Sequence, residues 1–113
     1  MTNHNAEIKQ ILSALSVPVA FLFYKGDATT YVTYREIDKA NDLGADDSVI
    51  GWIAYYDIDI YSRGNYLDLM DQIRTLLTGA GWTYQPNRDS FDMFESDTGY
   101  YHKTLCFCKE TMI

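Results

Sequence analysis

Side chains at positions 52–61 change character at every second residue, which is the period of a β-strand. One face would carry Trp52, Ala54, Tyr56, Ile58 and Ile60, and the other Ile53, Tyr55, Asp57, Asp59 and Tyr61. The first face is apolar and predicts a side packed on a core. The second mixes aromatic rings with two carboxylates, which predicts a face neither fully buried nor fully solvated. We therefore regard Tyr55, Asp57, Asp59 and Tyr61 as a candidate contact face.

The spacing becomes helical after the turn-forming segment 62–65. Apolar residues then recur on one stripe, at Tyr66, Leu69, Met70, Ile73, Leu76 and Leu77. We expect Asn65 to accept hydrogen bonds from the first free backbone amides and Asp68 to place negative charge in the first turn. Gly79 is expected to end the helix in the left-handed conformation.

A shorter helical stripe, Ile8, Ile11, Leu12 and Leu15, predicts a first helix within residues 5–15, with Asn3 and Asn5 as possible caps. Pro18 then opens an apolar run at 19–24, which predicts a strand buried on both faces. Residues 25–28 read as a turn, and 29–37 is predicted to return as the hairpin partner of that strand.

Residues 38–48 contain many acids and few apolar side chains, which predicts an exposed loop. Its acids Asp42, Asp46 and Asp47 form a candidate partner-contacting loop.

Beyond the second helix, short strands are predicted at 81–84 and 91–95, then a turn at Asp97-Thr98-Gly99 and an alternating strand at 100–110. The whole chain, 1–113, is therefore predicted to be one α+β domain. Its mixed or antiparallel sheet would have four to six strands, with two main helices packed on one face. Too few helices are predicted to supply the crossovers of a parallel doubly wound fold.

The composition narrows the classes of partner. Sixteen acids against nine bases give a net charge of −7, which argues against a protein that binds nucleic acid by neutralising phosphates. No segment has the roughly 20 apolar residues of a membrane span. The first residues lack the basic and apolar blocks of a secretory signal, so the expected location is a cytoplasm.

Two sets of residues in the sequence could be imagined as metal sites, but neither set has enough ligands. Asp57 and Asp59 share a strand face as a divalent-cation site would need, but further ligands are not identifiable. His102, Cys106 and Cys108 also share a face, yet structural zinc needs four ligands. Cys106 and Cys108 are expected to be free thiols, because neighbours on one strand face are badly placed for a mutual disulfide.

No segment resembles a nucleophile turn, and Gly79-Ala80-Gly81 follows a helix, where a phosphate loop would precede one. We therefore predict no catalytic residues and no cofactor, and a protein that works through its surfaces.

Three stretches of the sequence resemble the tail terminator, or tail completion, proteins of long-tailed bacteriophages and related prophages. The first is Tyr55-Tyr56-Asp57-Ile58-Asp59-Ile60-Tyr61-Ser62, and the second is the helix through Leu69, Ile73 and Leu77 into Gly79-Ala80-Gly81-Trp82. The third, Asp97-Thr98-Gly99-Tyr100-Tyr101-His102-Lys103, opens the final strand. Together they cover about half of the chain. Head-completion and minor capsid proteins of phages are alternatives of similar appearance.

The resemblance implies a homohexameric ring that binds the head-proximal end of the tail tube, stops its growth and presents a docking surface for the head. Its partners would be other copies of the chain, the tail tube protein and a head-completion or connector protein. The expected location is the virion, reached from the host cytoplasm, and no catalysis is implied. The hairpin residues Asp97, Tyr100, Tyr101 and His102 are further candidate contacts.

Six copies at −7 each would carry a formal charge of −42, and acids lining a channel would let DNA pass without specific binding. Two other functions stay open. One is a small ligand-binding or regulatory domain with aromatic side chains around a pocket. The other is a metal-dependent enzyme that uses Asp57 and Asp59.

Overall fold

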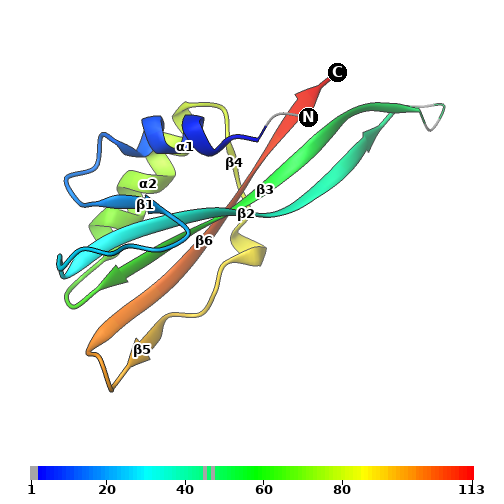
Figure 1. The fold of residues 1–113 in the computed structure, drawn as a ribbon. Helices are drawn as coiled ribbons and strands as arrows, with labels where there is room; N and C mark the ends of the chain where they lie inside the picture. The colour runs from blue at the N-terminus through cyan, green and yellow to red at the C-terminus, as the bar shows by residue number, and fades with distance from the viewer. Residues whose placement is uncertain (1–2, 45, 47) are drawn as a thin grey trace.

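The computed structural model describes residues 3–44, 46 and 48–113. These residues form two α-helices, one short 3-10 helix and six strands (Figure 1). In chain order these are α1 (Asn5–Leu12), β1 (Val19–Phe21), β2 (Thr30–Leu43), β3 (Val49–Ser62), α2 (Leu67–Gly79), β4 (Thr83–Tyr84), η1 (Pro86–Arg88), β5 (Met93–Glu95) and β6 (Tyr100–Met112). Among the described residues, none of the helices is long and apolar enough to cross a membrane.

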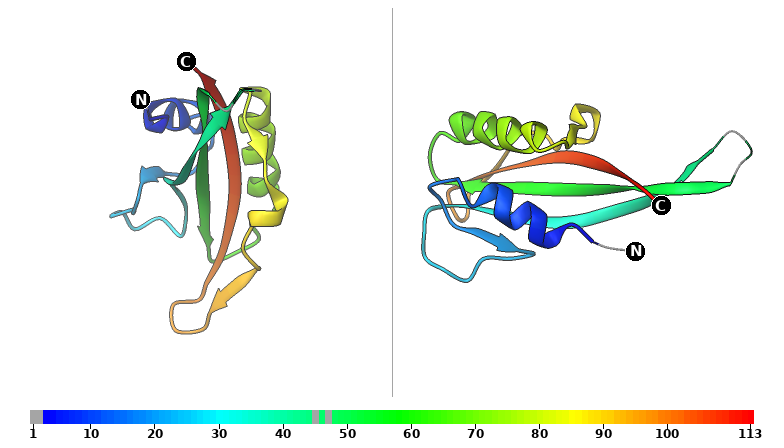
Figure 2. Two further views of the ribbon diagram at one scale, coloured as in Figure 1. Left: turned by 90° about the vertical axis from the view of Figure 1, so that its right-hand side faces the viewer. Right: turned by 90° about the horizontal axis from the view of Figure 1, so that it is seen from above.

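All six strands belong to one mixed sheet. Its order is β1-β2-β3-β6-β4, with β5 also paired to β6. Only β1 runs parallel to its neighbour, and the other pairs are antiparallel. Both helices lie on the same face of this sheet (Figures 1 and 2). The predicted α+β fold is therefore confirmed, including the mixed sheet and the two helices on one face.

The core lies between the helices and the apolar face of the central strands. Its fully buried members come from five elements: Ile8 and Leu12 of α1, Val32 of β2, Ala54, Tyr56, Ile58 and Ile60 of β3, Ile73 and Leu77 of α2, and Leu105 and Phe107 of β6. Each such side chain contributes about 1.5–3 kcal/mol by leaving water. The predicted division of residues 52–61 between two faces is confirmed, although Trp52 is only half-buried because it lies toward the end of the sheet that the helices do not cover.

Strands β2 and β3 form a long antiparallel pair that extends beyond the helices as an arm (Figure 2). The prediction of an exposed loop at 38–48 was wrong for 38–43, because these residues pair with β3. A register shift between Glu36 and Asp38 breaks the alternation that would have revealed the strand. The described part of the actual turn is Gly44, Asp46 and Ser48.

Strand β1 differs from its prediction in two ways. It runs parallel to β2, with Val19 opposite Val32, so the predicted hairpin was wrong. It also lies at the edge of the sheet, and the apolar run leaves its last side chains in solvent, so burial on both faces was wrong.

Helix α2 begins as expected and ends differently. Asn65 Oδ1 accepts a hydrogen bond from the Leu67 amide at 2.9 Å, which confirms its role at the helix start. The left-handed residue at the other end is Gly81, with φ of 96°, and Gly79 is still helical. The predicted turn before β6 is confirmed, since Gly99 has φ of 76° and its amide donates to the Glu95 carbonyl at 2.8 Å.

Candidate functional surfaces

The sheet face opposite the helices is polar and spans three strands. The candidate residues Tyr55, Asp57, Asp59 and Tyr61 of β3 lie along it. Their register partners on β6 are Cys108, Cys106, Thr104 and His102. Arg35 and Tyr31 of β2 stand opposite Asp57 and Tyr61. Strand pairing therefore gathers charged, aromatic and thiol side chains on one face.

Aromatic rings form a continuous stack across one end of this face. Tyr31 stacks on Tyr61 with ring centroids 4.9 Å apart, and Tyr61 stacks on His102 at 4.2 Å. Tyr24 extends the series, with its ring centroid 4.6 Å from that of Tyr31. Such offset stacking stabilises each pair by about 0.5–1.5 kcal/mol beyond burial. The stack holds Tyr61 and His102 in fixed orientations.

The two carboxylates on this face have different surroundings. Asp59 is 7% exposed, and its Oδ1 accepts hydrogen bonds from Thr104 Oγ1 at 2.5 Å and faces His102 Nε2 at 3.2 Å. Asp57 lies 3.8 Å from the Arg35 guanidinium. Burial, and next the charge of Asp59, raise the pKa of the Asp57 carboxyl. Asp59 is thus held within the fold by hydrogen bonds, while Asp57 is a half-buried carboxylate beside Arg35.

The same face carries the residues considered above for metal binding. Within the described part of the chain, no group of three or more His, Cys, Asp or Glu side chains is arranged to hold a metal ion. Both cysteines are free thiols, as predicted. Burial, and next the nearby Asp57 carboxylate, raise the pKa of the Cys106 thiol to about 11, so the thiol stays protonated at neutral pH.

The hairpin residues divide between the two faces of the sheet. Tyr100 lies on the polar face, where the Arg63 guanidinium sits 4.9 Å from its ring centroid. Tyr101 points to the other side and contacts Phe94, with ring centroids 4.9 Å apart. His102 belongs to the aromatic stack, and Asp97 is exposed in the turn. These four predicted contacts therefore do not form one surface.

The acidic residues of the predicted loop lie at the tip of the arm. Asp42 is paired in β2, and Asp46 caps the turn by accepting hydrogen bonds from the Ser48 amide and hydroxyl at 3.2 and 2.6 Å. Asp47 lies outside the described residues. The tip thus presents at least two carboxylates far from the helices.

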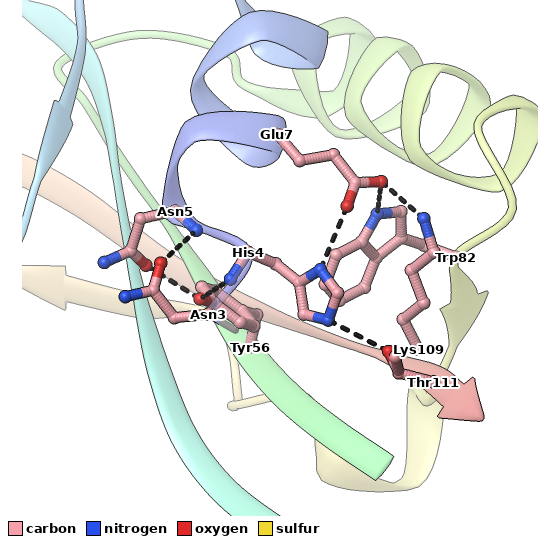
Figure 3. A network of polar contacts seen from close by, with 8 residues as sticks. All are labelled: Asn3, His4, Asn5, Glu7, Tyr56, Trp82, Lys109 and Thr111. Carbon is pink, nitrogen blue, oxygen red and sulfur yellow. Dashed lines mark hydrogen bonds and ion pairs between the residues drawn. The ribbon is translucent and has the colours of Figure 1, made fainter. Parts of the chain in front are cut away.

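A polar network joins the start of α1 to β6 and to the residues after α2 (Figure 3). His4 Nδ1 is 3.0 Å from Glu7 Oε1, and its Nε2 is 3.3 Å from the Thr111 hydroxyl. Glu7 Oε2 accepts hydrogen bonds from Trp82 Nε1 at 3.1 Å and Lys109 Nζ at 2.5 Å. Nearby, the Tyr56 hydroxyl donates to Asn5 Oδ1 at 2.7 Å.

The Thr111 hydroxyl, the His4 imidazole and the Glu7 carboxylate lie in the same order as the groups of a catalytic triad. The carboxylate, however, is already bound by an indole and an ammonium group, and the imidazole ring packs edge-on against Trp82 at 5.2 Å. The network therefore serves best as a clamp that fixes the N-terminal segment onto the sheet.

Two exposed apolar surfaces lie elsewhere. The first, which we call the wedge, consists of Phe21, Leu22 and Phe23, which are 45%, 54% and 61% exposed. Leu22 has φ of 67°, and the Phe23 amide donates to the Phe21 carbonyl at 2.8 Å, which makes a tight γ-turn. A left-handed leucine costs of order 1–3 kcal/mol, so this turn is held in place by its surroundings.

The second, which we call the groove, lies between the start of α2 and β5 and has a volume of about 500 Å³. Its main lining residues are Arg63, Tyr66, Leu67, Met93, Phe94 and Tyr101. Leu67 and Phe94 are 57% and 56% exposed. The Tyr66 hydroxyl donates to Asp92 Oδ1 at 2.5 Å, which fixes one wall to the other. Contiguous exposed apolar surface of this kind usually marks a contact site.

Comparison of the sequence with models of known protein families and with curated proteins found no match. The inference of function therefore depends on the residues and their arrangement.

Neither the wedge nor the groove was predicted. The wedge lies in a run of apolar residues that also suits a buried strand, and only its place at the sheet edge distinguishes the two cases. The groove brings Leu67 beside Phe94, which are distant in the sequence and share no periodic pattern. A usable signal was Phe91, Met93 and Phe94 in a short, acid-flanked segment, where three large apolar residues have little room for burial.

Proposed function

We propose that this chain is a tail terminator, or tail completion, protein of a long-tailed bacteriophage. Six copies would form a ring on the head-proximal end of the tail tube, end its polymerisation and provide the surface on which the head docks. The proposal joins the sequence resemblance to one structural observation, namely two different apolar surfaces at opposite edges of the sheet.

Those surfaces suit a ring because cyclic assemblies of more than two subunits need a pair of different, complementary patches on each subunit. The wedge lies at the end of β1, the edge strand of the sheet, and the groove borders β5, which pairs with β6 toward the other edge. A subunit can thus offer one patch to the preceding copy and the other to the next. Two identical patches meeting across a twofold axis would give only a dimer.

The arm and the net charge support the same function. The arm extends the molecule to 52 Å along its longest axis, against 25 and 23 Å across, and offers surface separate from the wedge and groove. This surface is a candidate for contact with the tube or the head protein. The net charge of −7 suits a ring through which DNA passes without binding.

Light scattering over a range of protein concentrations, combined with negative-stain electron microscopy, tests the proposal. A hexameric ring, either free or on the end of tubes formed by the phage's tail tube protein, is the expected result. A chain that stays monomeric at every concentration and leaves tube ends bare would refute it.

A further inference from the structure

We propose that the wedge of one subunit inserts into the groove of the next, so that this contact forms the seam between copies. This inference rests on the proposed ring and specifies the residues that hold it together. The occupant of the groove is thus a second copy of this chain, through Phe21, Leu22 and Phe23.

The two surfaces match in size and character. The wedge offers two aromatic rings and a leucine, each about half exposed, on a short turn that projects from the sheet edge. The groove offers an open space of about 500 Å³ between aromatic and aliphatic walls. Large aromatic side chains that fill a pocket on the partner are the usual centre of a protein interface.

Charges beside the two surfaces are also complementary. Lys25 follows the wedge, and its ammonium group sits 5.4 Å from the Phe23 ring centroid. Asp92, just before β5, lines the groove, and its carboxylate also lies 3.5 Å from the Lys103 ammonium group. Glu95, the last residue of β5, is exposed next to the groove residue Phe94. Within the described part of the chain, Lys25 forms no ion pair.

Hydrogen bonds within the subunit hold the turn of the wedge, from the Leu22 amide to the Tyr34 carbonyl at 3.1 Å and from the Phe23 amide to the Phe21 carbonyl at 2.8 Å. Leu22 adopts a left-handed conformation that a branched side chain rarely takes, and yet its side chain is 54% exposed. The strain therefore presents an apolar side chain to solvent. Docking into a neighbouring groove would bury this side chain, and the removal of its apolar surface from water would stabilise the contact.

Two single substitutions test the contact. Phe23→Asp removes the wedge and Phe94→Asp removes the groove wall, while both positions are more than half exposed, so the fold is retained. Phe91→Asp is the matched control, because Phe91 is 88% exposed and does not line the groove. Thermal melting of each variant checks that the subunit is folded.

Assembly is then measured by sedimentation-velocity ultracentrifugation at concentrations at which the wild type assembles, with tube protein added if the wild type requires it. Phe23→Asp and Phe94→Asp should each lose the ring entirely, while Phe91→Asp keeps it. An equimolar mixture of the two defective variants should give one-to-one dimers and nothing larger, because only one intact wedge and one intact groove remain per pair.

The outcomes separate the two proposals. If the wild type forms rings and the two variants still do, or if their mixture stays monomeric, the seam lies elsewhere and this inference falls while the ring stands. If the wild type forms no ring even with tube protein, both proposals fall. Dimers from one defective variant alone would indicate a twofold contact and would also refute the seam.

Discussion

Glu7 is the residue on which the N-terminal segment most depends. Its carboxylate contacts side chains of three separate segments, through His4, Trp82 and Lys109. Burial alone would raise the pKa of Glu7, but hydrogen bonds from Lys109, Trp82 and His4 outweigh it and lower the pKa below 4.5. The ionised form is therefore favoured in the folded state.

Replacement of this carboxylate by an amide should weaken the clamp. We expect Glu7→Gln to lower the free energy of unfolding by about 1–2 kcal/mol at pH 7, because charge-assisted hydrogen bonds from Lys109 and Trp82 are weakened. Glu110→Gln, at an exposed position on the same strand as Lys109, is the control and should change little. Chemical denaturation measures both.

The pH dependence of stability follows from the lowered pKa of Glu7. Its contribution is present above the unfolded value of 4.5 and is lost as the pH falls through the lower folded pKa. The wild type should therefore lose stability in acid more steeply than Glu7→Gln. Parallel acid denaturation curves for the two proteins would contradict this account of the network.

Asp57 shows the opposite effect. Its folded pKa is raised by burial and then by Asp59, so the folded state is destabilised as the pH rises from 3.8 through that folded pKa. We expect Asp57→Asn to stabilise the protein at pH 7 by up to about 1 kcal/mol, with loss of the Arg35 contact as a partial offset. The melting temperature of Asp57→Asn at pH 7 is compared with that of the wild type, and Asp97→Asn, at an exposed position, is the control. A melting temperature of Asp57→Asn below that of the wild type would contradict the prediction.

Strand β3 is the element that organises the molecule, because it pairs with β2 on one side and β6 on the other for nearly its whole length. The backbone of β6 approaches β3 closely at Gly51. A Cβ there would lie 2.2 Å from the Thr111 carbonyl oxygen, which is backbone and cannot rotate away. The junction of β3 and β6 in the arm thus requires glycine.

We expect Gly51→Ala to destabilise the protein by about 1–3 kcal/mol, because β3 and β6 must separate locally. Gly64→Ala is the control, since a Cβ at Gly64 meets no atom within 4 Å. Thermal melting of both variants should show a loss at Gly51 alone. Equal melting temperatures would mean that the arm adapts without cost.

Helices and strands could be predicted from the sequence where the spacing of apolar residues alone determines the structure. The two faces of residues 52–61 and the stripe of α2 each follow from periodicity and a single core. The outer half of β2 did not follow, because a register shift at Glu36 interrupts the alternation and acids there also suit a loop. The prediction that the apolar run at β1 is buried was wrong for a different reason. Apolar residues that are exposed look the same in a sequence as apolar residues that are buried.

At the scale of the whole molecule, a sheet with an arm along one direction and different apolar patches at its edges is suited to repeated, directional assembly. The polar sheet face then becomes a candidate lining of the ring. On that face, burial and next the charge of Asp59 raise the pKa of Asp57.

The arm tip should act in docking and not in ring formation. We expect replacement of residues 43–50 by Asn-Gly, between the paired Asp42 and Gly51, to leave the fold and the ring intact. Binding to the tube or to the head-completion protein should be weakened, because the tip carries the exposed Asp46. Co-sedimentation with preformed tubes measures the effect, and loss of the ring itself would show that the tip is part of the seam.

The most direct test of the proposed function is the length of tail tubes assembled with and without this protein. Tube protein is polymerised in the presence of increasing amounts of the chain, and tube lengths and ends are recorded by electron microscopy. The account predicts a hexameric ring on one end only and an arrest of growth at that end. Tubes of unchanged length with bare ends would contradict it.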